Sequence, residues 1–462
     1  MLFNSLVFLF FFLIVTSCYY LLPHKLRWVW LLLASCYFYM YFKPVYILII
    51  FFTILVDYVA GIGIEMASGY YKKVFLVLSL VTNIGVLAFY KYFNFLSQNI
   101  NVLSHKFGGP QLPLLDFILP IGLSFHTFQA MSYTIEVYRG NQRAERHLGI
   151  YALYVMFYPQ MVAGPIERPQ QLLPQFYKKI QFNKRTFIAG LFLMIVGLFK
   201  KVVIADRLGL YVDPVFSDPH RHTSLELLTA TYFFAFQIYC DFSGYTDIAI
   251  GAALTLGIEL MKNFNMPYLS GNIAVFWKRW HISLSSWFRD YLYIPLGGNR
   301  VTFLRNCANV LIVFLISGLW HGANWKYLVW GCIHGCLLIG YLLWKKLKIS
   351  RNVFPFIGWL VTFNCVCLAW VFFRADTVGE AVYIITKIFT GNGFSFADRH
   401  IMPHTEIGYC AFLIILLLSA EVKMQRIAVI SNKQMISWGI FLVLACYFLG
   451  IFNETQFIYF QF

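Results

Sequence analysis

Long apolar runs separated by short polar loops dominate the pattern of hydrophobic and polar positions along this chain. A run needs about 20 residues to cross the hydrocarbon core of a bilayer as a helix. Strands in a membrane would alternate apolar and polar positions, and these runs do not alternate. The pattern predicts an all-α polytopic membrane protein with about 11–13 transmembrane helices, because some runs are too short or too polar to span. The runs lie at residues 2–22, 26–42, 44–64, 73–92, 114–135, 148–164, 186–204, 225–240, 244–260, 303–320, 325–344, 354–373, 407–420 and 435–451.

Basic residues mark the ends of the early runs. Lys25 follows the first run, Lys72 follows the third and Arg143 follows the fifth. Cytoplasmic loops carry the excess of Lys and Arg, so these ends are expected in the cytoplasm and the N-terminus outside. The basic residues at 178–185 would then fall outside if the sixth run crossed the membrane.

Prolines explain how the sixth run avoids crossing. Pro159, Pro165 and Pro169 follow it closely, together with Gly164. Proline and glycine interrupt a helix, and the backbone groups that they free at membrane depth must be satisfied inside the protein. We therefore expect residues 148–170 to form a re-entrant segment.

A second irregular region covers residues 263–299. Apolar and aromatic side chains recur there at helical spacing, whereas basic, acidic and hydroxyl side chains occupy the other faces. This pattern predicts an amphipathic helix that lies in the membrane interface with its aromatic side chains inward. The residues on the apolar face are Trp277, Trp280, His281, Leu284, Phe288 and Tyr291.

Composition supports a membrane protein and excludes other classes. Of the 462 residues, 60% are hydrophobic and 12% are charged, against about 25% charged residues in a soluble domain. The net charge is +16, but the basic residues sit beside apolar runs, so nucleic acid is not an expected partner. The ten cysteines form no CxxC pair, and neither a metal site nor a disulfide framework is expected. The polar gaps are only loops, which indicates a single membrane-embedded domain, 1–462.

His321 is the strongest candidate for chemistry. It lies in SGLWHGANW, residues 317–325, and Lys326 is the only charged residue between 309 and 344. An ionisable group at membrane depth is a functional-site candidate, and a buried neutral imidazole can act as a general base or a proton shuttle. Gly318 and Gly322 leave room for a substrate. The alternative is a histidine that is hydrogen-bonded between helices, which is also the interpretation for His334.

Two further groups are candidates for binding. Lys278 and Arg279 adjoin His281, and a positive, aromatic-lined surface suits an anionic donor such as a nucleotide thioester. An interfacial histidine in an aromatic belt is the alternative for His281. Asp241 and Asp247 are six residues apart, so they do not share a helix face, and a structural pairing with a cation is favoured for them over catalysis.

Motifs for other chemistries are absent from the sequence. No P-loop occurs, so ATP-driven transport is not supported. Neither GxSxG nor HExxH occurs, so the chain has no serine-hydrolase elbow and no zinc-protease site of its own.

The chain resembles the membrane-bound O-acyltransferases, and among them the bacterial branch that contains the alginate O-acetyltransferase membrane subunit. The resemblance covers essentially the whole chain in order. The resembling segments are highly specific for the family, but they say less about which acceptor molecule is acylated. The segments that carry it are residues 1–5, 120–125, 162–166, 239–245, 276–284, 317–325, 370–375 and 457–460.

The resemblance implies a ring of tilted helices around a central tunnel, with His321 catalytic and His281 as the second family position. It implies acetyl transfer from a cytoplasmic thioester, such as acetyl-CoA, to a polysaccharide outside a bacterial cytoplasmic (inner) membrane. The implied partners are a serine-hydrolase-like (SGNH) acetyltransferase, polysaccharide export or synthesis proteins, and membrane lipid. No bound cofactor is implied.

In the expected mechanism, His321 deprotonates the attacking hydroxyl, and a buried Asn324 bonds His321 or the oxyanion. A covalent acyl-histidine is an alternative route. The candidates for binding donor or substrate are Lys278, Arg279, Trp280, Trp320, Asn324, Trp325, Asp241 and Tyr245. Other functions left open are D-alanyl transfer to teichoic acid, peptidoglycan O-acetylation and, in a different class, a proton-coupled transporter, although no internal repeat favours the last.

Overall fold

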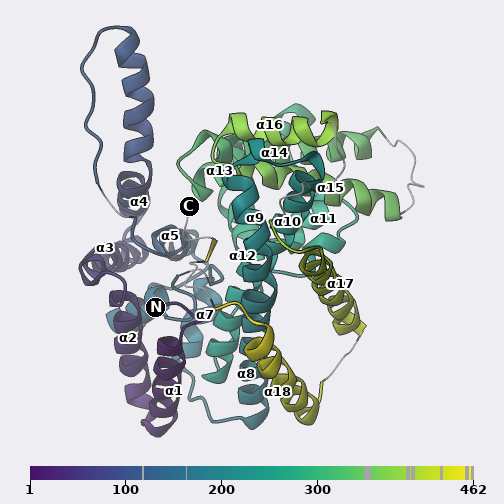
Figure 1. Cartoon of the computed structure of the whole chain (residues 1–462). Coiled ribbons are helices and arrows are strands. Elements are labelled where there is room, and N and C mark those ends of the chain that lie inside the picture. The colour runs from purple at the N-terminus through teal and green to yellow at the C-terminus, as the bar shows by residue number, and fades with distance from the viewer. Residues whose placement is uncertain are drawn as a thin grey trace. The chain divides into compact units, whose positions relative to one another are not determined.

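In the computed structural model, the regular secondary structure of the described residues is helical (Figure 1). The description covers residues 1–462 except 117–118, 163, 348–354, 392–395, 397–400, 427–429, 453–456 and 459–462. These described residues contain no β-strand. They form two compact units, 1–194 with 248–261 and 195–247 with 262–462, and the boundaries fall within α8 (Lys184–Phe199) and α10 (Ser224–Thr255). The prediction of a single domain stays a prediction.

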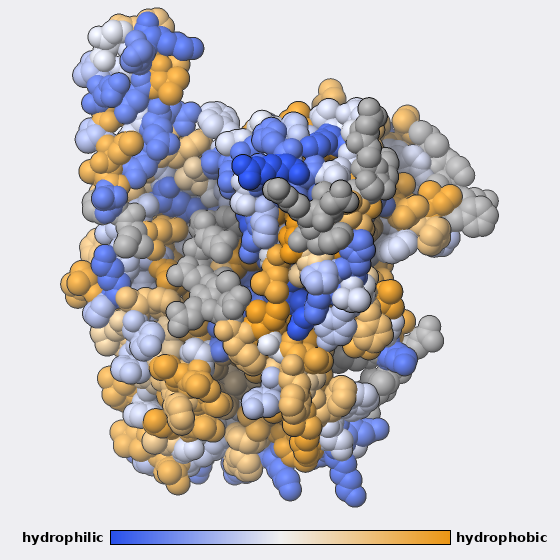
Figure 2. All heavy atoms as spheres, viewed as in Figure 1, coloured by the Kyte–Doolittle hydropathy of each residue, from blue (hydrophilic) through white to orange (hydrophobic). Residues whose placement is uncertain are grey.

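Eight helical segments of the described chain are long and apolar enough to cross a membrane. Multi-pass insertion is therefore supported, and large apolar side chains are exposed along these helices, as contact with lipid requires (Figure 2). The predicted number of 11–13 is larger because it includes shorter helices, such as α1 (Leu6–Leu21) with 16 residues. The eight segments are Pro44–Met66, Gly69–Lys106, Lys184–Ser217, Phe303–His321, Trp325–Lys346, Pro355–Arg374, His404–Lys423 and Asn432–Leu449.

The first unit packs α3 (Ile47–Met66), α4 (Gly69–Lys106) and α5 (Leu123–Arg139) against one another. Buried polar side chains tie the three helices. Asp57 on α3 accepts hydrogen bonds from Ser79 Oγ (2.6 Å) and Asn83 Nδ2 (2.8 Å) on α4, and Ser79 Oγ also lies 3.0 Å from Thr134 Oγ1 on α5. The other helices of this unit, besides α1, are α2 (His24–Met40), α6 (Leu148–Met156) and α7 (Pro169–Tyr177).

The far half of α4 forms a hairpin with the chain that follows it (Figure 1). Two asparagines clamp that chain: Asn94 bonds both backbone groups of Leu115, and Asn101 bonds both backbone groups of Leu112. The helix has 38 residues, or about 57 Å at 1.5 Å per residue, which exceeds the bilayer core of about 30 Å.

The sixth apolar run forms only a short helix. α6 has nine residues, about 14 Å in length, which is too short to span. Because the helix stops at Met156, the carbonyl group of Tyr154 in its last turn needs another partner. Gln129 Nε2 and Gln160 Nε2 both donate to that carbonyl oxygen (2.5 and 2.8 Å). Every residue from Ile150 to Met156 is buried. The re-entrant path of 148–170 stays a prediction, and Ala163 lies outside the described residues.

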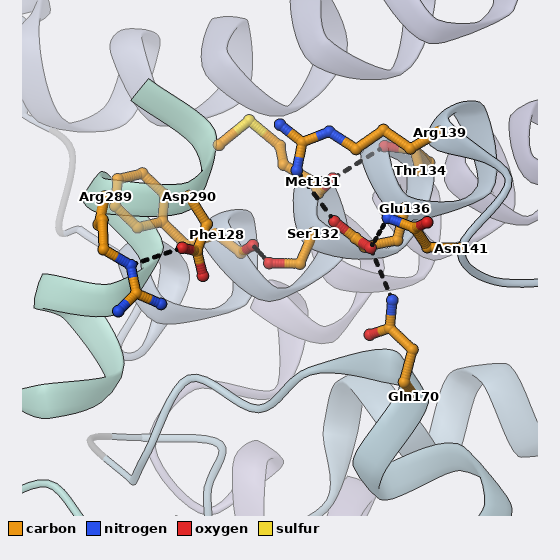
Figure 3. A network of polar contacts seen from close by, with 10 residues as sticks. All are labelled: Phe128, Met131, Ser132, Thr134, Glu136, Arg139, Asn141, Gln170, Arg289 and Asp290. Carbon is orange, nitrogen blue, oxygen red and sulfur yellow. Dashed lines mark hydrogen bonds and ion pairs between the residues drawn. The ribbon is translucent and has the colours of Figure 1, made fainter. Parts of the chain in front are cut away.

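A polar cluster at the end of α5 joins that helix to α7 (Figure 3). Glu136 accepts hydrogen bonds from Arg139 (3.2 Å), Asn141 (3.0 Å) and Gln170 (2.7 Å). α5 ends at Gly140, whose φ of 78° is readily adopted only by glycine. Figure 3 also labels Arg289 and Asp290 of the second unit, whose Nε and Oδ1 atoms lie 2.7 Å apart.

The second unit carries most of the candidate residues. α13 (Phe303–His321) and α14 (Trp325–Lys346) form a close helical hairpin, because side chains at Gly318 and Gly331 would collide with the backbone carbonyls of Tyr327 and Phe314. The other helices of this unit are α9 (Asp206–Ser217), α11 (Ile273–Arg279), α12 (Ile282–Phe288), α15 (Pro355–Arg374), α16 (Val378–Thr390), α17 (His404–Arg426) and α18 (Asn432–Leu449).

Candidate functional site

His321 is the last residue of α13 and lies among aromatic rings. The rings of Trp320, Trp330 and Phe373 approach its imidazole edge-on, with centroids at 5.0, 5.1 and 5.4 Å. Only 6% of the residue is exposed. Helix α13 ends here because Gly322 adopts an extended conformation. An imidazole nitrogen that carries no proton can accept one from a hydroxyl group, which is the chemistry of a general base.

His281 interrupts the amphipathic helix predicted over 263–299. The structure has two short helices, α11 and α12, where one was expected. The chain turns between them at His281, which has a left-handed φ of 43°. Such a conformation is uncommon for a residue with a side chain and marks a strained position. Burial lowers the pKa of His281 to about 3, so this ring is neutral at pH 7.

Trp320 brings the two histidines together. Its ring centroid lies 6.1 Å from that of His281 and 5.0 Å from that of His321. The Phe242 ring of α10 closes the other side of His281 at 4.7 Å, edge-on. The histidines are 40 positions apart in the sequence and come from different helices, yet one indole contacts both.

The basic residues beside His281 lie at the end of α11. Lys278 is exposed and Arg279 is half-buried, and both stand in the last turn, where cations interact favourably with the helix dipole. Trp280 points the other way. It is buried and packs on Trp370 of α15 with centroids 4.9 Å apart, so it belongs to the aromatic core beside the site.

Asn324 does not supply a buried donor, which corrects the sequence-based expectation. The residue is exposed, and its Oδ1 accepts a hydrogen bond from the backbone N–H of Lys326 (3.1 Å). It is therefore the N-cap of α14. Trp325, the first residue of that helix, is 57% exposed and does not enclose His321.

Asp241 belongs to a buried ion cluster of the second unit. Its Oδ1 lies 2.6 Å from Nζ of Lys201, and Lys201 also reaches Asp206 at 2.8 Å. The other oxygen of Asp241 accepts the backbone N–H of Ile458 at 2.9 Å. Asp247 pairs separately with Lys200 at 2.8 Å. The predicted pairing of these carboxylates with cations is what the structure shows.

Tyr245 lies next to this ion cluster. Its ring meets the ring of Phe457 edge-on at 4.4 Å. Phe457 and Ile458 carry the part of the resembling C-terminal segment that the structure describes, and Tyr459 and Phe460 lie outside the described residues. Asp241 and Tyr245 therefore contact the C-terminal residues Ile458 and Phe457, respectively.

Sequence reasoning named His334 and Trp277 separately and did not bring them together with Trp330. The prediction of a hydrogen-bonded structural histidine is wrong, because no partner lies within hydrogen-bonding distance of either ring nitrogen among the described residues. His334 is fully buried against Trp277 and Trp330. The sequence could have indicated that His334 lies near His321, because it follows 13 residues later, in the helix that returns along α13.

The side chain of Lys326 has a backbone partner, and the described residues offer no cluster that could hold a metal ion. The buried ammonium of Lys326 donates to the carbonyl oxygen of Ala375 at 2.8 Å. Across the described part of the chain, no group of three or more His, Cys, Asp or Glu side chains could hold a metal ion.

Comparison with known proteins places these residues in a family context. The model of the membrane-bound O-acyltransferase family matches residues 123–375, a range that includes both histidines of the site. A peptidoglycan O-acetyltransferase of Helicobacter pylori is 38% identical over 397 residues, which cover 79% of this chain and 74% of that protein. The probable alginate O-acetylase AlgI of Azotobacter vinelandii is 36% identical over 422 residues, which cover 90% and 83%. A teichoic acid D-alanyltransferase of Bacillus subtilis is 28% identical over 295 residues, which cover 60% and 74%.

Proposed function

The chain belongs to the membrane-bound O-acyltransferase family, and on that premise we propose that it transfers an acetyl group from a cytoplasmic thioester, acetyl-CoA, for the O-acetylation of a polysaccharide outside a bacterial cytoplasmic membrane. It is a multi-pass membrane acyltransferase. The observation that carries the proposal is the placement of His321 at the end of α13, beside Trp320, Trp330 and Phe373.

The relatives favour acetyl over D-alanyl transfer. The two acetyl-transferring relatives are 38% and 36% identical to this chain over 79% and 90% of its length. The D-alanyl-transferring relative is 28% identical over 60% of the chain. The acetylating relatives act on different polymers at similar identity, so the proposal names an extracytoplasmic polysaccharide, alginate or peptidoglycan, as the acceptor class.

In the proposed mechanism, His321 acts as a general base. It removes the proton of the attacking hydroxyl as that oxygen bonds to the carbonyl carbon of the thioester. The carbon–sulfur bond then breaks, and the leaving thiolate takes up the proton that His321 holds. Since the aromatic walls exclude water, the thioester is protected from hydrolysis. His281 supports Trp320 beside His321, and the positive charge of Lys278 and Arg279 suits the anionic end of the donor.

We also propose that the attacking hydroxyl belongs to an extracytoplasmic serine-hydrolase-like partner that passes the acetyl group to the polysaccharide. Polysaccharide synthesis or export proteins complete the assembly. The names of the alginate and peptidoglycan relatives support a polymer acceptor. Purification of the chain with its neighbours in the membrane, followed by transfer of labelled acetyl to a serine of a co-purified hydrolase, tests the partner.

The decisive experiment compares His321→Ala with His105→Ala. His105 is exposed at the end of α4 and serves as a matched control. We expect the first variant to accumulate in the membrane normally and to lose acetylation, and the second to behave as the wild type. Polymer ester content and membrane protein level are the two measurements. Normal acetylation by His321→Ala would refute the proposed function of His321.

A further inference from the structure

Next to His321, the three rings of Trp277, Trp330 and His334 carry buried nitrogen atoms that the described protein leaves without a hydrogen-bond partner. His334 lies 4.9 Å from both Trp277 and Trp330, and the two indoles lie 5.8 Å apart, measured between ring centroids. Among the described residues, neither ring nitrogen of His334 and neither indole nitrogen has a hydrogen-bond partner. Buried polar groups nearly always have one, and each that lacks one destabilises the fold.

The cluster lies on the cytoplasmic side of His321. Arg300 and Arg305 precede or begin α13, and Lys345 and Lys346 end α14. Because basic residues mark the cytoplasmic ends, the hairpin turns at its outer end, beside His321. His334 stands nine residues along α14 from Trp325, or about 14 Å back toward the cytoplasm.

The three rings lie between His321, where the thioester reacts in the proposed mechanism, and Lys278, where the anionic end of the donor would bind. Trp330 contacts both His321 and His334, with centroids at 5.1 and 4.9 Å. Trp277 is half-buried, and the next residue is the exposed Lys278. A donor whose anionic end rests at Lys278 and whose thioester reaches His321 would therefore pass these three rings.

The unused groups select the chemistry of the ligand. Two indoles offer two N–H donors, and a neutral imidazole offers one donor and one acceptor. A secondary amide satisfies three of these four groups, because its carbonyl oxygen accepts two hydrogen bonds and its N–H donates one. A phosphate or carboxylate would bring charge into a buried site and leave the imidazole acceptor empty, and a hydrocarbon chain would satisfy none of the four nitrogens.

We propose that Trp277, Trp330 and His334 form a binding site for the secondary amides of the pantetheine arm of the acyl donor. This inference rests on the proposed function, because it assumes a pantetheine thioester. The site holds the donor arm so that its thioester reaches His321 in the geometry for attack. His334 is a binding residue and takes no proton in the reaction.

A donor series tests the proposal in the full-length reconstituted protein. We expect His334→Phe to lower kcat/KM with S-acetylpantetheine about 3- to 10-fold, the effect of losing one or two buried hydrogen bonds. With S-ethyl thioacetate, which has no amide, kcat/KM should stay within twofold of the wild type. Trp330→Phe and Trp277→Phe should show the same selectivity with a smaller factor.

Trp370→Phe is the matched control. Trp370 packs on Trp330, but its indole already donates to the hydroxyl of Tyr268 at 3.1 Å. The control should change kcat/KM by the same factor for both donors. An equal loss with both donors in His334→Phe would overturn the proposal, because it would show a structural histidine or one that holds only water. A loss confined to acceptors that carry an acetamido group would also overturn it, since the amide would then belong to the acceptor.

Direct binding separates this proposal from the proposed function. Isothermal titration of the wild type with pantetheine, which carries no acyl group, should give binding that His334→Phe weakens several-fold and Trp370→Phe does not. Absence of pantetheine binding to the wild type would overturn the site. Pantetheine binding without transfer from any thioester would instead sink the proposed function and leave the amide site standing.

Discussion

Two buried polar regions of the second unit differ in how their groups are satisfied. In the ion cluster, Lys201 reaches Asp206 and Asp241, and Asp241 also receives the backbone N–H of Ile458. In the aromatic cluster, His334 has no hydrogen-bond partner among the described residues and is enclosed by indole and phenyl rings. A paired buried charge is needed by the fold, whereas an unsatisfied buried group costs stability and indicates a ligand.

The same contrast separates the two main functional candidates of the sequence. Asp241 and His321 are both polar residues in apolar runs, but Asp241 is held by an ammonium and His321 by aromatic edges. Substitutions in the ion cluster should therefore change protein level, and substitutions in the aromatic cluster should change activity. The predictions below test that separation.

The largest effect is expected at His321. Replacement by Gln keeps a polar side chain of similar size but removes the basic nitrogen, so acetyl transfer should fall about 10²- to 10⁴-fold, the usual contribution of a general base. The thermal unfolding midpoint in detergent should stay close to that of the wild type. A large drop in that midpoint, with activity per folded molecule preserved, would show that His321 is structural.

Lys201→Met should have the next largest effect, on stability. It leaves Asp206 and Asp241 buried without their cation, which costs about 3–5 kcal/mol when one partner of a buried pair is removed. We expect little protein in the membrane fraction. The double variant Lys201→Met, Asp241→Leu removes one of the stranded charges and should recover part of the level. If the protein level of the double variant did not recover, the Lys201–Asp241 pair would have a role beyond neutralising charge.

Asp57→Leu provides a parallel test in the first unit. The carboxyl group accepts hydrogen bonds from Ser79 and Asn83. Ser79 keeps Thr134 as an acceptor when the carboxyl group is lost, but one buried N–H of Asn83 loses its acceptor, at a cost of about 1–3 kcal/mol. Asp57→Asn keeps one acceptor and should cost less. Denaturation followed by the accessibility of an engineered cysteine on α3 measures the difference. Equal stability of the two variants would argue against the pairing.

The smallest effect is expected at Asn324. As the N-cap of α14, its replacement by Ala should cost about 1 kcal/mol and leave acetyl transfer within twofold. Asn324→Asp retains the capping oxygen and should restore stability. A loss of activity of 100-fold or more in both variants would reinstate the oxyanion role that the exposed position of Asn324 contradicts.

Much of the helical architecture and most of the candidate residues could be predicted from the sequence. Apolar runs of about 20 residues determine membrane helices because no other open backbone structure satisfies its hydrogen bonds in lipid. The motif around His321 identified the family and the central histidine. The helix over 263–299 was mispredicted as continuous, because helical spacing continues across His281 and a single left-handed residue leaves no trace in a hydrophobic pattern.

The sequence by itself determined the helical class and the membrane location of the apolar runs, and it singled out His321 as the candidate base, because these follow from hydrophobic length and from a local motif. Only the tertiary structure decided which polar residues are paired. The cation of Asp241 comes from 40 residues earlier in the chain, Asn324 turned outward to cap a helix, and His334 joined Trp277 from another helix. Such partnerships depend on how separate helices pack, and hydrogen-bond satisfaction in a buried site is a property of that packing.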